Sequence, residues 1–204
     1  MRRPRFIARQ AERPSGVFGR VLGAIMAVET RALNDEVLRH LGIAPGERIL
    51  EIGFGHGRTL ERAAKATPNA RFAGIDHAED IVAALSRRAR RLVDEGRLEL
   101  RACDSSALPW PDATFDGAFA VHTIYFWPDP ARHLAEIHRV LRPGGRLLLG
   151  FRDRTPDVEA SVPPDIYHLR SRDEVLALLT AAGFETTASA GSGRNLWIAD
   201  ARKR

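Results

Sequence analysis

The 204-residue chain contains a single cysteine, Cys103, which limits both its covalent and its metal chemistry. One thiol excludes an intramolecular disulfide, a cysteine-only metal centre and an iron–sulfur cluster held by three thiolates. The sequence also lacks any apolar run that approaches the roughly 18 residues of a membrane-spanning helix. We therefore expect a protein of the reducing cytoplasm, without a membrane span.

Outside the first twenty residues the chain has almost no net charge. The formal net charge is +5, and residues 1–20 alone hold six arginines and one glutamate, which gives 6 − 1 = +5. A nearly neutral remainder argues against a broad phosphate-binding face, so we do not expect a nucleic-acid partner. No apolar signal-peptide region follows the arginines. We expect residues 1–16 to form a basic flexible arm, with contact to an anionic partner as the alternative.

Short apolar strands alternate with helices from residue 48 onward, and this rhythm is typical of a doubly wound α/β sheet with mostly parallel strands. The length suits one domain over residues 1–204, as a monomer or homodimer. It would comprise the arm, a helical cap over 17–44 and a catalytic α/β core over 45–204. The expected strands are 48–52, 71–75, 98–102, 115–121 and 145–151, and the expected helices are 58–66, 78–94 and 130–141.

The C-terminal part departs from the alternating rhythm. Ser171, with Glu174 three residues later, predicts a capped helix that ends at Gly183. Two apolar segments, 184–190 and 195–201, follow with only a short glycine-containing connection. Such a connection favours a hairpin, so the sheet should gain an antiparallel strand.

A glycine-rich turn follows the first expected strand, in the sequence Glu51-Ile52-Gly53-Phe54-Gly55-His56-Gly57. Glycine tolerates positive φ and has no Cβ, so a ligand could approach the backbone, and the next helix would direct free N–H groups at an anion. A dinucleotide fingerprint needs G-x-G-x-x-G, but Arg58 follows the last glycine, which disfavours a nicotinamide oxidoreductase. A tight turn without a ligand is the structural alternative.

Two further acids follow expected strands. Asp76 ends the second strand about 20 residues after the glycine turn, where this architecture places a carboxylate against ribose hydroxyls. Asp104 follows the third strand. Each could instead cap a helix, but three acids at the ends of three parallel strands favour one shared site.

Residues 51–57 resemble the first motif of the class I S-adenosylmethionine-dependent methyltransferases, and the chain is similar to the small-molecule, type 11-like members. The segment Arg139-Val140-Leu141-Arg142-Pro143-Gly144-Gly145 resembles their turn before the fifth strand, which we interpret as scaffold. The resemblance implies a Rossmann-like, seven-stranded sheet with an antiparallel C-terminal strand and an N-terminal helical cap. It also implies S-adenosyl-L-methionine as cofactor and S-adenosyl-L-homocysteine as product. The residues it assigns to cofactor binding are Glu51, Gly53, Gly55, Gly57, Asp76, His77, Cys103, Asp104, Ser105 and His122.

Methyl transfer needs alignment in a dry site, and a general base only where the acceptor atom must lose a proton. The segment after the fourth strand supplies the catalytic candidates His122 and Tyr125, although His122 could only bond backbone and Tyr125 could be core. Neither an Asn-Pro-Pro-Tyr motif nor an aspartate cluster for magnesium is evident. We therefore expect metal-independent transfer to a small molecule. The alternatives are a lipid headgroup or macromolecule as acceptor, and a non-catalytic module that binds the cofactor.

Overall fold

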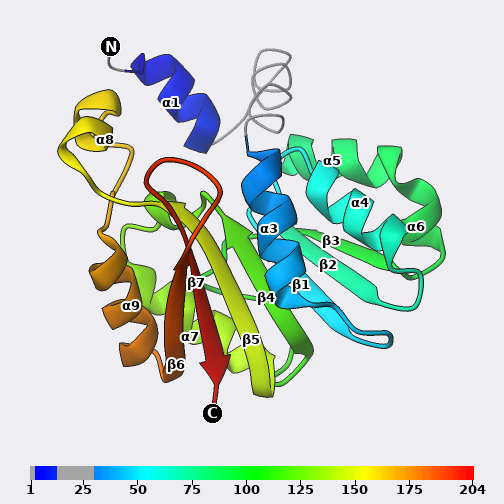
Figure 1. Ribbon diagram of the computed structural model, residues 1–204. Helices are drawn as coiled ribbons and strands as arrows, with labels where there is room; N and C mark the ends of the chain where they lie inside the picture. Colours follow the sequence, from blue (N-terminus) through cyan, green and yellow to red (C-terminus); the bar gives the residue numbers. More distant parts are fainter. Residues whose placement is uncertain (1–2, 13–29) are drawn as a thin grey trace.

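The computed structural model describes residues 3–12 and 30–204, which are built around a seven-stranded sheet (Figure 1). The strand order is β3-β2-β1-β4-β5-β7-β6, and only β7 and β6 pair antiparallel with their neighbours. The expected fold class, a doubly wound and mostly parallel sheet with an antiparallel C-terminal strand, is therefore confirmed. The strands are β1 (Arg48–Ile52), β2 (Arg71–Asp76), β3 (Leu98–Ala102), β4 (Phe115–Val121), β5 (Leu141–Arg152), β6 (Phe184–Ala190) and β7 (Leu196–Lys203).

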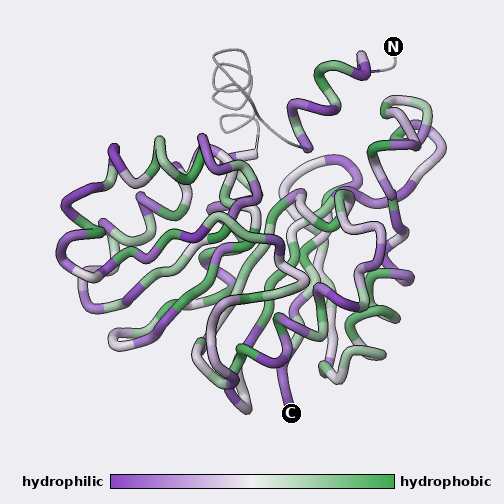
Figure 2. The backbone as a smooth tube through the Cα atoms, turned by 180° about the vertical axis from the view of Figure 1, so that it is seen from behind, coloured by the Kyte–Doolittle hydropathy of each residue, from purple (hydrophilic) through white to green (hydrophobic). Residues whose placement is uncertain are grey.

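Helices cover both faces of the sheet, and a separate hydrophobic core fills each side. Figure 2 shows the hydrophobic segments concentrated on the central strands, whereas hydrophilic stretches recur along the outer helices. Among the described residues, no helix is long and apolar enough to cross a membrane. The helices are α1 (Arg5–Glu12), α3 (Arg31–Leu41), α4 (Arg58–Ala66), α5 (Glu79–Arg88), α6 (Arg90–Asp94), α7 (Pro130–Val140), α8 (Pro156–Ser161) and α9 (Arg172–Ala181), with a short 3₁₀ helix, η1, at Ile124–Phe126.

The sheet order positions the ligand-binding edge. The chain moves outward from β1 to β2 and β3, and then returns to place β4 on the other side of β1. A crevice forms outside the carboxyl ends of strands at such a reversal, because the connecting loops diverge to the two faces. In Figure 1, α1 and α8 lie beyond this same edge.

Two helical segments differ from the sequence-based expectations. Residues 5–12 form α1 instead of a flexible arm, because Ala8 is fully buried and Arg5 pairs with Asp165 at 3.1 Å. The expected helix 78–94 is divided into α5 and α6 at Ala89, where φ is −102°. No proline or glycine marks that break in the sequence. Of the expected arm and cap, residues 1–2 and 13–29 lie outside the described residues, and α3 occupies residues 31–41 of the cap.

The start of β5 also differs, since it begins at Leu141 instead of residue 145. Its register with β4 shifts after the first pair, so residues 142–145 form an irregularity in the strand. Gly145 fits there because an added Cβ would lie 2.8 Å from the carbonyl oxygen of Arg142. The capped C-terminal helix and the hairpin form as expected, with Ser171 and Glu174 making a complete capping box.

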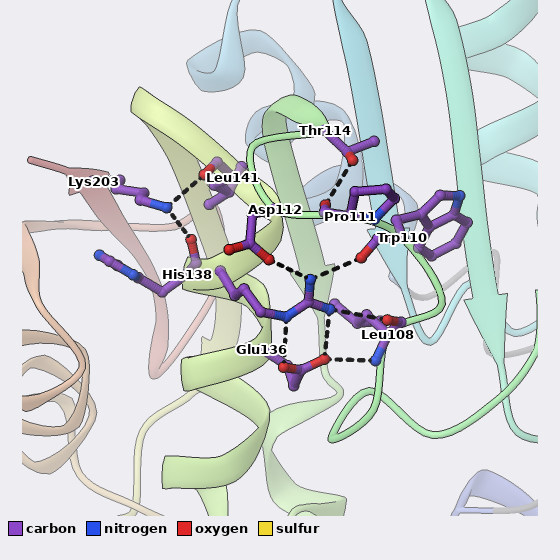
Figure 3. Close-up of polar contacts among 10 residues, drawn as sticks. Leu108, Trp110, Pro111, Asp112, Thr114, Glu136, His138, Leu141 and Lys203 are labelled. Carbon is purple, nitrogen blue, oxygen red and sulfur yellow. Dashed lines mark hydrogen bonds and ion pairs between the residues drawn. The ribbon is translucent and has the colours of Figure 1, made fainter.

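Arg139 fastens the loop after β3 to α7. Its guanidinium donates to both carboxylate oxygens of Glu136 at 2.8 Å, to Asp112 at 2.9 Å, and to the carbonyl oxygens of Leu108 and Trp110 at 3.0 and 2.8 Å (Figure 3). Glu136 also accepts from the backbone N–H of Leu108 at 2.8 Å. These bonds raise the pKa of Arg139 and fix the loop that starts at Asp104.

Substitution of this arginine should destabilise the fold. We expect Arg139→Gln to lower the free energy of unfolding by about 1–3 kcal/mol, because hydrogen bonds to charged groups contribute about that much and two carbonyls lose their donor. Urea unfolding followed by circular dichroism measures the change. Arg132→Gln, at an exposed position of the same helix, is the control and should change stability by less than about 0.5 kcal/mol. Equal stability of the two variants would contradict the role given to Arg139.

Candidate functional site

A cavity of about 1340 Å³ opens at the carboxyl ends of the parallel strands. All the site residues predicted from the sequence line it, so the fold brings together loops that are far apart in the chain. Residues from α1, α8 and the loop that follows α8 line it as well. The predicted residues on its wall are Glu51, Gly53, Gly55, Gly57, Asp76, His77, Cys103, Asp104, Ser105, His122 and Tyr125.

The three glycines of the turn after β1 all have positive φ, between 52° and 69°, but they are needed for different reasons. An added Cβ at Gly53 would lie 2.8 Å from the side chain of Thr123, and at Gly57 it would lie 2.2 Å from Leu85. At Gly55 the same atom would meet nothing within 4 Å. Gly53 and Gly57 therefore permit close packing inside the protein, whereas Gly55 leaves backbone open to the cavity.

Glu51 is an acid without a full set of partners. It is only 4% exposed, and its Oε2 atom has no hydrogen-bond partner. Burial, with a smaller contribution from the neighbouring carboxylate of Asp76, raises the pKa of Glu51 well above its usual range, and Arg62 offsets this only in part. Buried polar atoms are normally hydrogen-bonded, so an orphaned oxygen on a cavity wall indicates a missing donor or cation.

Asp76 connects the ends of β1 and β2. Its Oδ2 accepts from the N–H of Gly55 at 2.9 Å, and its Oδ1 accepts from the N–H of Ala78 at 3.0 Å. Asp76 thus stabilises the turn before α5, which agrees with the structural alternative that it caps a helix. Each carboxylate oxygen can accept more than one bond, so Asp76 retains capacity for two hydroxyl donors from a ligand.

The loop after β3 forms the next part of the wall. Asp104 accepts from the N–H of Ser106 at 2.8 Å, and hydrogen bonds lower its pKa although burial opposes them. Ser105 is buried and bonds the Nδ1 atom of His133 at 2.7 Å. His133 also stacks on Trp127, with ring centroids 4.9 Å apart and planes 7° apart. His133 lies on α7, and no sequence pattern connects it to Ser105, so its part in the site could not be predicted.

Cys103 and His77 also face the cavity from neighbouring loops, and they differ in exposure. Cys103 is half-buried, and burial raises the pKa of its thiol, followed in importance by the negative charge of Asp104. His77 is exposed at the turn before α5. The thiol therefore acts as an apolar wall atom and not as a nucleophile.

His122, which is half-buried, and Tyr125, which is buried, form a pair after β4. His122 has φ of 58°, and its Nδ1 lies 3.1 Å from the hydroxyl of Tyr125. That hydroxyl accepts from the backbone N–H of Arg152 as well, and the donor in its bond with His122 is set by the imidazole tautomer. Burial, and then the positive charges of Arg152 and Arg3, lower the pKa of His122 to about 4. Burial raises the pKa of Tyr125. At neutral pH both groups are therefore uncharged.

Several further residues on the wall gave no recognisable sequence signal. Thr123 packs on the glycine turn and donates to the carbonyl oxygen of Ile52 at 3.2 Å. Arg3, which precedes α1, and Arg152, the last residue of β5, also line the cavity. Tyr167, from the connection between α8 and α9, also lines it. The part of the expected helical cap that lies outside the described residues includes the hydrophobic residues Phe18, Leu22, Ile25 and Met26.

The protonation state of His122 is directly measurable. We expect its imidazole NMR signals to stay unchanged between pH 8 and pH 5, because the neutral ring is stabilised down to a pKa of about 4. His122→Asn serves to assign the signals. A midpoint between pH 6 and 7 would show that the ring is not desolvated in this way.

The sequence also matches known proteins. Residues 50–149 match the family described as methyltransferase domain. An uncharacterised methyltransferase of Bacillus subtilis is 32% identical over 165 residues, which cover 81% of this chain and 86% of that protein. The 27-O-demethylrifamycin SV methyltransferase of Amycolatopsis mediterranei is 33% identical over 172 residues, with 79% of this chain and 62% of that enzyme covered.

The similarity extends to solved structures. The crystal structure of a SAM-dependent methyltransferase from Aquifex aeolicus superposes with a TM-score of 0.70 at 23% identity, and covers 86% of this chain and 93% of that one. At this identity the likeness concerns the fold. The chain thus spans most of the Bacillus and Aquifex proteins, but about three fifths of the Amycolatopsis enzyme.

Proposed function

The chain belongs to the class I S-adenosylmethionine-dependent methyltransferases, and on that premise we propose that it transfers a methyl group to a small-molecule acceptor without a metal ion. The carrying observation is the cavity in which the open backbone of Gly55, the orphaned oxygen of Glu51 and the carboxylate of Asp76 meet. A relative acting on 27-O-demethylrifamycin SV supports a small-molecule acceptor.

The residues present fit the cofactor. The orphaned, buried carboxyl of Glu51 suits the ammonium group, and Gly55 allows the methionine part to lie against bare backbone. Asp76 offers acceptor capacity to the ribose hydroxyls. Asp104 and Ser105, with Cys103 and His77 beside them, would border the adenine, and Asp104 would accept from its amine. These assignments follow the order of the strands β1, β2 and β3, whose carboxyl ends carry the residues.

When bound, S-adenosylmethionine would supply a methyl group on a sulfonium sulfur. An acceptor atom would attack the methyl carbon in line with the C–S bond, and the sulfur would leave as a thioether. The chain's part is then to align the two molecules and exclude water. His122 is a poor general base at neutral pH, because burial and the charges of Arg152 and Arg3 lower its pKa to about 4. We assign His122 to donation from Nε2 toward the cavity and Tyr125 to holding that ring.

We propose that the transfer needs no metal ion, because in-line displacement at a methyl group requires alignment in a dry site. Asp76 and Asp104 accept from backbone N–H groups, and Glu51 is buried beside the glycine turn. The part of these acids would be positioning and electrostatics.

Two measurements test the proposal. Calorimetry of the purified chain with S-adenosylhomocysteine should show binding, and its absence would remove the proposed function. A metabolite extract incubated with methyl-labelled S-adenosylmethionine should then yield a labelled small molecule. Label found only in protein, lipid or nucleic acid would redirect the proposal to another acceptor.

Asp76→Ala should weaken S-adenosylhomocysteine binding at least about tenfold. The substitution removes acceptors for the hydroxyls and releases the N–H groups of Gly55 and Ala78, and bonds to a charged group contribute about 1.5–3 kcal/mol each. Calorimetry gives the affinity. Asp80→Ala, at an exposed position in the first turn of α5, is the matched control and should bind as the parent does. Unchanged affinity of Asp76→Ala would refute its ribose role.

Glu51 should make cofactor binding pH-dependent. Because its pKa is raised in the free protein and an ammonium group favours the carboxylate, affinity for S-adenosylhomocysteine should rise with pH from 5 to 8. Glu51→Gln should bind more weakly and with a flatter pH profile. Calorimetry at several pH values measures both, and parallel profiles for the two proteins would disprove the ammonium contact.

A further inference from the structure

An aromatic cluster forms one end of the cavity, away from the glycine turn. The ring of Tyr167 lies 6.0 Å from that of Tyr125 and 5.1 Å from that of Phe126, measured between centroids. Tyr125 and Tyr167 are 5% and 7% exposed, and all three residues line the cavity. A planar, apolar ligand could therefore pack against a wall of rings.

Two arginines flank this cluster. The guanidinium of Arg3 donates to the hydroxyl of Tyr167 at 3.0 Å, and the backbone N–H of Arg3 donates to the carbonyl oxygen of Ser161 at 2.7 Å. Arg152 ends β5, and its backbone N–H donates to the hydroxyl of Tyr125. Both arginines line the cavity, and the positive charges of both lower the pKa of His122. The two cations therefore act on the same region, beside the His122–Tyr125 pair.

Neither arginine has a carboxylate partner within the described part of the chain. The nearby acids are engaged elsewhere, since Asp165 pairs with Arg5 at 3.1 Å and Glu159 with Arg154 at 3.9 Å. Glu12, the last residue of α1, also lines the cavity, but it forms no ion pair with Arg3 or Arg152. The two arginines on the cavity wall therefore have no ion-pair partner among the described residues.

The opposite end carries the negative charge, on Asp76 and Asp104, beside the ionisable carboxyl of Glu51. Those acids suit a cationic donor, as proposed above. The arginine end needs an anion, and a guanidinium binds a carboxylate through two parallel hydrogen bonds. The adjacent rings require that the same ligand be flat and apolar next to its charge.

We propose that the methyl acceptor is a hydroxylated aromatic carboxylate, with its carboxylate between Arg152 and Arg3 and its ring against Tyr125, Phe126 and Tyr167. Its ring hydroxyl forms the new O–CH3 bond as the S–CH3 bond of the sulfonium breaks, and the hydroxyl proton passes to solvent. This assignment rests on the proposed function, because it names the acceptor class of that same cavity. The negative acceptor lies opposite the positive sulfonium, so the field of the cavity favours binding of the two together.

Calorimetry on the protein saturated with S-adenosylhomocysteine tests the assignment. The probes are 4-hydroxybenzoate and cinnamate, each beside its neutral amide, and hexanoate as an acid without a ring. We expect the aromatic acids to bind at least about tenfold more tightly than their amides, the difference that a charged hydrogen bond contributes. Amides that bind equally well, or no binding of any aromatic acid, would overturn the proposal. Hexanoate that binds as tightly as the aromatic acids would overturn the role of the rings.

Variants locate the binding. Arg152→Gln should reduce the acid-to-amide ratio several-fold, and Arg3→Gln should do the same. Arg154→Gln is the matched control, because Arg154 lies two residues beyond Arg152, pairs with Glu174 at 2.9 Å and does not line the cavity. An equal loss in the control, or no loss in Arg152→Gln, would refute the site. Circular dichroism and S-adenosylhomocysteine affinity verify that each variant is folded. If the parent protein itself did not bind S-adenosylhomocysteine, the proposed function would be refuted instead.

Discussion

The hydrogen bond from the N–H of Gly55 to Asp76, 2.9 Å long, ties the turn after β1 to the end of β2. Because the strands are parallel and adjacent, the two loops leave the sheet at the same edge, and this bond fixes how they diverge. Gly53 and Gly57 permit the turn to pack on Thr123 and Leu85. The remaining glycine, Gly55, then presents bare backbone. The geometry of the whole cofactor end depends on this small junction.

Burial gives the junction its chemical character. Glu51 lies beside Asp76 in a water-poor environment, so its pKa is raised and one of its oxygens has no partner. Such an arrangement costs stability, because a buried acid without partners loses its hydration. The cost is offset only when a cation or donor arrives. The destabilisation of Glu51 in the free protein is therefore relieved on binding, which strengthens the affinity for a ligand that carries such a group.

The same cavity has opposite charges at its two ends. Acids lie around the glycine turn, whereas Arg3 and Arg152 lie near the aromatic end. His122 is located between these regions and is held neutral by burial and by the two arginines. A neutral histidine bonded to Tyr125 keeps its orientation over a wide pH range. Selectivity for the acceptor therefore depends on this electrostatic division more than on any titrating base.

The sequence by itself determined the alternating elements, the glycine turn and the acids at the ends of the strands, because periodicity and turn chemistry act over a few neighbouring residues. It did not determine the division of the helix at Ala89 or the start of β5 at Leu141, which depend on packing and strand register. Only the tertiary structure brought Arg3 to Tyr167, 164 positions away, and Ser105 to His133. It alone decided the pKa values of Glu51 and His122. Burial depends on the whole fold, and so do the protonation states of Glu51 and His122, because burial shifts the pKa values of both residues.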